Sequence, residues 1–154
     1  NKKSRMIKFL PTKRVTKETN IDFDLLSKIC TSIFEKGFNR KLNIKCKVWK
    51  SNIKEVSTME CTKGRSHFTM RLDTEGDRRY VFSTILHELR HGFQENVFRY
   101  NTLARFSSYN AYYNSEEERD ARKQEKLATE IIRIYDTYKR AEEKFERFNL
   151  KELG

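Results

Sequence analysis

The chain has few of the residues that build disulfide scaffolds, and it has no long hydrophobic run. Its 154 residues include three cysteines, and none of them forms a C-x-x-C pair. We therefore expect free thiols in a reducing, cytoplasmic compartment. No apolar stretch approaches the roughly 20 residues that a membrane-spanning helix needs. A chain of this length can bury a sizeable core without disulfides, which favours a single domain.

Acidic residues are the minority among the charged ones. The chain holds 33 Lys and Arg against 22 Asp and Glu, which gives a net charge of +11. The excess is densest in residues 1–19, where seven basic residues accompany a single acid, Glu18. We interpret residues 1–19 as a basic N-terminal arm and residues 20–154 as one domain. Such an arm favours nucleic acid or another acidic partner, and we expect no membrane contact.

Hydrophobic periodicity predicts an α+β fold. Apolar residues recur at helical spacing over residues 21–36, and Gly37 is the predicted helix terminator. Residues 41–48 then alternate between apolar and polar side chains, as a half-buried strand does. Further strands are predicted at 55–62 and 67–72. The expected start of the fold is thus an N-terminal helix followed by a small, mostly antiparallel sheet.

Two helices are predicted after the sheet. The first runs roughly from Arg78 to Arg99, and the second is a long, charged C-terminal helix from about Ser115 to Phe148. Residues 100–114 between them are polar and aromatic without a strong period, so we expect a loop or an irregular crossover.

Histidine is scarce, yet two of the three histidines stand in one short motif. The segment His87-Glu88-Leu89-Arg90-His91 matches H-E-x-x-H. Residues four apart share a helix face, so both imidazoles can bind one Zn²⁺. The intervening Glu88 can reach a water on the metal rather than the metal itself. Because the metal lowers the pKa of that water towards roughly 7, we expect Glu88 to take its proton as a general base.

The predicted helix keeps the motif apart from its apolar side. On a wheel of about 100° per residue, six side chains fall within about 60° of His87: Tyr80, Ser83, Thr84, His91, Gln94 and Phe98. The far side carries the large apolar residues Phe82, Ile85, Leu86, Leu89, Phe93 and Val97. We therefore expect one face to join the core and the other to border a cleft.

A catalytic zinc site needs a third protein ligand. The metzincin pattern of a Gly and a third His after the motif is missing, since Gln94 and Val97 occupy those positions. A carboxylate from the last helix, as in gluzincins, is the remaining option. Its start offers several candidates: Glu117, Glu118, Asp120 and Glu125. Ser115 and Glu118 also match a capping box, in which the Glu118 carboxylate would bond back to the Ser115 backbone.

The motif and its continuation resemble a known family. Residues 87–94, H-E-L-R-H-G-F-Q, are similar to the H-E-x-x-H-x-x-Q of ImmA/IrrE-like metallopeptidases and related phage-borne zincins. That family carries a later E-x-x-A element whose Glu is the third zinc ligand. Glu118-Arg119-Asp120-Ala121 fits it, 27 residues after His91. The resemblance implies a zincin-like fold, a phage association and a peptidase with His87, His91 and Glu118 as zinc ligands.

Peptide hydrolysis also needs a group that stabilises the oxyanion. Tyr112 and Tyr113 lie just before the last helix and are our candidates, with Tyr109 and His67 as alternatives. Two other functions stay open at this point. The first is a catalytically silent zincin-fold protein of structural or virion type, and the second is a basic protein associated with nucleic acid.

Overall fold

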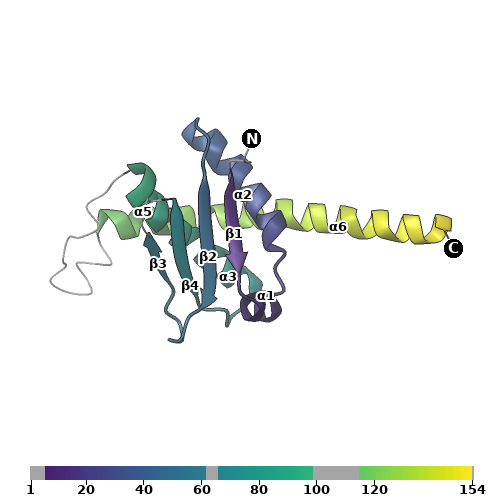
Figure 1. The fold of residues 1–154 in the computed structure, drawn as a ribbon, viewed down its shortest axis with the longest axis horizontal. Helices are drawn as coiled ribbons and strands as arrows, with labels where there is room; N and C mark the ends of the chain where they lie inside the picture. The colour runs from purple at the N-terminus through teal and green to yellow at the C-terminus, as the bar shows by residue number, and fades with distance from the viewer. Residues whose placement is uncertain (1–5, 62–65, 99–114, 154) are drawn as a thin grey trace.

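The computed structural model describes residues 6–61, 66–98 and 115–153 (Figure 1). Its sheet has four strands: β1 (Ile7–Pro11), β2 (Ile44–Lys50), β3 (Thr58–Cys61) and β4 (His67–Leu72). Their order across the sheet is β1-β2-β4-β3. The pairs β1–β2 and β2–β4 are parallel, and only β3–β4 is antiparallel. The fold is therefore α+β as expected, but the prediction of a mostly antiparallel sheet is wrong.

The position of β3 explains why β4 lies parallel to β2. After β2 the chain crosses to the outer position as β3 and returns between the two as β4. β3 runs opposite to β2, and β4 turns back antiparallel to β3. β4 therefore runs parallel to β2. The alternation of apolar residues predicts each strand separately, but it does not predict which strand lies beside which.

Residues 7–19 belong to the fold. Ile7 and Phe9 of β1 are buried in the core, and Val15 of the following helix joins them. Lys8 points outward between the two buried residues. The interpretation of residues 1–19 as an arm thus fails from residue 7 onward, because the basic residues there are the exposed half of a strand and a short helix. Residues 1–5 lie outside the described part of the chain.

The described helices are α1 (Lys13–Thr19), α2 (Phe23–Phe38), α3 (Arg78–Phe93), a π-helical turn η1 (Gln94–Phe98), α5 (Glu116–Gln124) and α6 (Leu127–Leu153). The Asp22 side chain accepts from the Leu25 N–H and caps α2. Gly37 does not end this helix as predicted. It lies within the last turn, and Asn39 ends the helix instead, with a left-handed φ of 52°.

The predicted helix from Ser115 to Phe148 is two helices in the structure. It breaks after Gln124, and α6 starts at Leu127. The Glu125 N–H donates to the Arg122 carbonyl at 3.1 Å and the Lys126 N–H to the Lys123 carbonyl at 3.2 Å, so the chain tightens into a turn between the two helices. Both halves are rich in good helix formers, which is why the sequence pattern hides the break.

One face of the sheet is covered by helices. Aromatic pairs mark the contacts between elements: Phe9 with Phe23, Phe34 with Phe93 and Phe82 with Tyr135, with ring centroids 6.0, 5.0 and 5.3 Å apart. The strands lie in front of α3 and α6 in Figure 1. Within the described residues, no helix is both long enough and apolar enough to cross a membrane.

Candidate metal centre

Helix α3 places the H-E-x-x-H motif. Asp77 caps its start, because its carboxylate accepts from the Tyr80 N–H at 2.8 Å. The residues predicted to face the core are buried where the structure describes them: Phe82, Ile85, Leu86, Leu89 and Phe93. His87 and His91 are half-buried on the other face. The separation of a core face and a motif face is therefore confirmed.

Gly92 lets α3 lie close to the sheet. A Cβ atom at this position would overlap the ring of Phe68, which is fully buried in β4. The glycine between His91 and Phe93 thus has a steric reason that the motif alone does not reveal. It fixes how closely the helix that carries both histidines approaches the strands.

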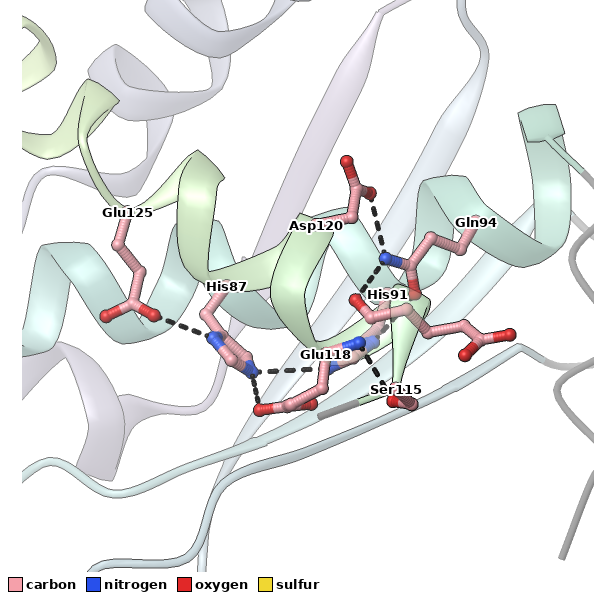
Figure 2. A network of polar contacts seen from close by, with 8 residues as sticks. His87, His91, Gln94, Ser115, Glu118, Asp120 and Glu125 are labelled. Carbon is pink, nitrogen blue, oxygen red and sulfur yellow. Dashed lines mark hydrogen bonds and ion pairs between the residues drawn. The ribbon is translucent and has the colours of Figure 1, made fainter. Parts of the chain in front are cut away.

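Glu118 meets both histidines from α5. The Ser115 hydroxyl accepts from the Glu118 N–H at 3.2 Å and starts the helix. One carboxylate oxygen of Glu118 lies 3.0 Å from Nε2 of His87, and the other lies 3.0 Å from Nε2 of His91 (Figure 2). Ser115 therefore forms its half of the capping box, while the Glu118 carboxylate reaches α3.

The spacing of these atoms suits a metal ion. The two Nε2 atoms lie 3.2 Å apart. Tetrahedral zinc with bonds of about 2.0–2.2 Å separates its ligand atoms by about 3.3–3.6 Å. One ligand atom from each of His87, His91 and Glu118 lies within 4.8 Å of the others. These three residues can therefore hold a metal ion, and their two imidazoles and one carboxylate are a donor set that zinc accepts.

The outer nitrogen of each imidazole has its own acceptor. Nδ1 of His87 lies 2.9 Å from Oε2 of Glu125, and Nδ1 of His91 lies 2.9 Å from Oε1 of Gln94. These acceptors assign a proton to each Nδ1 atom. In the neutral imidazoles, each Nε2 lone pair is then directed at the common centre.

A second hydrogen-bond network holds Gln94. Its amide nitrogen donates to the Glu117 carbonyl at 2.7 Å and to Asp120 Oδ2 at 2.9 Å, which leaves its amide oxygen for His91. Arg90 binds the Asp120 carboxylate with two nitrogens, at 2.8 and 3.1 Å. Burial acts to raise the pKa of Asp120, but these hydrogen bonds lower it overall. The network joins α3 to α5 around the histidines.

Burial and charge shift the pKa values of the motif residues. Burial raises the pKa of Glu88 to about 7, although the neighbouring His91 and His87 act to lower it. Burial acts to lower the pKa of His87, but hydrogen bonds to Glu118 and Glu125 outweigh it and raise the value to about 9. Such shifts are common where ionisable groups share a functional site.

The structure assigns different positions to the remaining candidates. Asp120 and Glu125, which the sequence offers as ligands, instead hold Gln94 and His87. Tyr109, Tyr112 and Tyr113 lie outside the described residues, so their oxyanion role stays a prediction. His67 is exposed on the sheet face opposite the core, which removes it as an alternative.

Three contributors were missed from the sequence. The motif predicts no role for Arg90 or Gly92, and the sequence presents Glu125 only as a candidate ligand. The three-residue spacing from His91 to Gln94 is a local signal that finds Gln94, since such residues are neighbours on a helix.

Comparison with known proteins gives no relative: no family model, curated protein or solved structure matches the chain.

Proposed function

We propose that the chain is a zinc-dependent metallopeptidase that hydrolyses peptide bonds of a protein substrate. The observation that carries the proposal is the convergence of His87, His91 and Glu118, with Glu88 buried in the same motif. Structural zinc sites are usually closed by four protein ligands, whereas catalytic sites combine three with an open position. Among the described residues the group has three members, which supports the catalytic type.

Each residue has a role in this proposal. His87, His91 and Glu118 would hold the zinc, which supplies a Lewis acid that makes water a stronger acid and polarises the peptide carbonyl. Glu88 accepts the proton of the attacking water and gives it to the leaving amine. Burial raises the pKa of Glu88 above its ordinary value, and this makes the carboxylate a stronger base. Glu125 and Gln94 keep the two imidazoles oriented.

The sheet supports a peptide as the substrate. Strand β3 is the outer strand on the side of α3, and the Cys61 thiol donates to the Gly92 carbonyl at 3.9 Å. Extended peptides bind by adding a strand to such an edge. The other edge already has partners from α2. The Ile7 N–H donates to Thr31 Oγ1, and the Phe9 N–H donates to Ser27 Oγ, both at 2.9 Å.

The test is hydrolysis of fluorescence-quenched peptide mixtures by zinc-loaded protein. Glu88→Gln should keep the metal and lose activity by about 100-fold or more, since a general base contributes about 10²–10⁴-fold. A chelator should stop the wild type, and added zinc should restore it. Equal rates for wild type and Glu88→Gln would contradict the proposal. Bound zinc without any cleavage would favour the catalytically silent alternative.

A further inference from the structure

The sheet face opposite the helices is basic. On this face the described strands expose Lys8 from β1, Lys45 and Lys47 from β2, and Arg71 from β4. We call these four residues the sheet cations. Glu60 of β3 is the one acid among the described strand residues on this side. Both lysines of β2 line a depression of about 410 Å³, together with Leu10, His67, Phe68 and Thr69.

The sheet cations form no ion pair within the described part of the chain, and two of them are direct neighbours. The strand register places Lys8 directly beside Lys45. Lys45 and Lys47 are about 6.6 Å apart along β2, because same-face residues are two apart at about 3.3 Å each. None of the four forms an ion pair with a described residue, whereas Lys50 at the end of β2 is paired with Glu18. Like charges side by side on a sheet destabilise it, and a bound anion would relieve this.

Trp49 continues the same row. It follows Lys45 and Lys47 on the exposed side of β2, it is 50% exposed, and the register places it beside Arg71. What sets Trp49 apart from the other exposed hydrophobic side chains is its place in a row of cations, since Lys47 precedes it on the same face and Arg71 lies beside it. The row therefore offers two positive charges and then a flat ring along one strand.

We propose that this sheet face binds single-stranded nucleic acid. The sheet cations contact phosphates, and the ring of Trp49 stacks on a base. Cationic grooves combined with aromatic stacking are the general means of binding single strands. An acidic protein would satisfy the charges but would give the tryptophan no base to stack on. A duplex keeps its bases paired and stacked, so it offers Trp49 no free base either.

The proposal is independent of the proposed peptidase. The sheet cations lie on the side of the sheet opposite the core, and α3 with its histidines lies on the core side. Binding therefore should not require zinc or Glu88. It also differs from an N-terminal arm as the anchor, because three of the four cations belong to β2 and β4.

Trp49 provides the direct probe, since it is the single tryptophan of the chain. We would titrate full-length protein with 20-nucleotide oligo-dT, oligo-rU, a 20-base-pair duplex and polyglutamate, following tryptophan fluorescence and, for all variants including Trp49→Ala, the anisotropy of a dye attached to the added polymer. The variants are Lys45→Glu/Lys47→Glu, the milder Lys45→Gln/Lys47→Gln, and Trp49→Ala. The matched control is Lys144→Glu/Arg147→Glu, which makes the same charge change on exposed residues of α6. Circular dichroism checks the fold of each.

Single strands should quench Trp49 and bind with a salt slope of about −3, as four phosphate contacts predict. Lys45→Glu/Lys47→Glu should bind at least tenfold more weakly and should lose about half of the salt slope. The loss of affinity should be somewhat smaller for Lys45→Gln/Lys47→Gln. Trp49→Ala should lose about tenfold in affinity. The α6 control should change little. DNA and RNA arms show which strand is preferred. Equal losses in the α6 control, no quenching, or equal binding of polyglutamate would overturn the proposal.

Discussion

Nδ1 of His87 lies 2.9 Å from Oε2 of Glu125. Glu125 is the residue that ends α5. Glu125 follows Glu118 by about two helical turns, so both carboxylates lie on the face of α5 that meets α3. Each histidine of the motif thus has its own acceptor, Glu125 for His87 and Gln94 for His91.

Removal of the Glu125 carboxylate should weaken metal binding without preventing it. Partners of ligand imidazoles typically contribute 10–100-fold to metal affinity. We therefore expect Glu125→Ala to raise the zinc dissociation constant by about that factor, measured by competition with a chelator. Glu125→Gln can still accept from Nδ1 and should fall between the alanine variant and the wild type. Wild-type affinity in Glu125→Ala would show that the contact does not orient His87.

The two glycines of α2 and α3 should respond oppositely to alanine. At Gly92 the new methyl group meets the buried Phe68 ring, so we expect the free energy of unfolding to fall by about 1–3 kcal/mol. At Gly37 no atom lies within 4 Å of the position of a Cβ atom. Alanine there should raise the free energy of unfolding by about 0.5 kcal/mol through its higher helix propensity.

Urea unfolding followed by circular dichroism compares both variants with the wild type. Zinc affinity should also fall in Gly92→Ala, because α3 must move to make room, and stay unchanged in Gly37→Ala. Equal stability of the two variants would contradict the close approach of α3 to β4.

Glu18 should make stability depend on pH in the acid range. Hydrogen bonds from Lys50 and Arg14 lower its pKa from 4.5 to about 2. The folded state therefore binds this proton less readily than the unfolded chain does. The stabilisation is complete above pH 4.5 and is lost as the pH falls towards 2.

The comparison is between wild type and Glu18→Gln, with melting temperatures measured from pH 2 to 7. The difference between them should be constant near neutral pH and should shrink between pH 4.5 and 2. A difference that grows on acidification would have the wrong sign for a lowered pKa.

The sequence was most informative at the candidate metal site, because its residues follow the spacing of a helix. The H-E-x-x-H spacing placed His87 and His91 on one face, and the match to E-x-x-A pointed to Glu118. The family resemblance itself stays a prediction. Apolar alternation found β2 and β4 and identified their buried sides. These features depend on local spacing, which a single chain displays directly.

The features that the sequence did not reveal depend on distant contacts. β1 was hidden because its five residues include a lysine and a proline within a basic segment. The parallel pairing of β2 with β4 depends on the position of β3, which no local pattern encodes. Arg90 reaches Asp120, which is 30 residues away, so its role becomes visible only when α5 is placed against α3.

Metal content decides whether the three residues form one zinc centre. We would measure zinc per chain by mass spectrometry after adding zinc and removing the excess, in wild type, His87→Ala, Glu88→Gln and Glu118→Ala. Glu116→Ala is the matched control, because it removes an exposed carboxylate from the same turn of α5. We expect about one zinc per chain in the wild type, in Glu88→Gln and in the control, and loss of zinc in His87→Ala and Glu118→Ala. A wild type that binds no zinc, or a Glu118→Ala variant that binds it as well as the control does, would contradict the proposed centre.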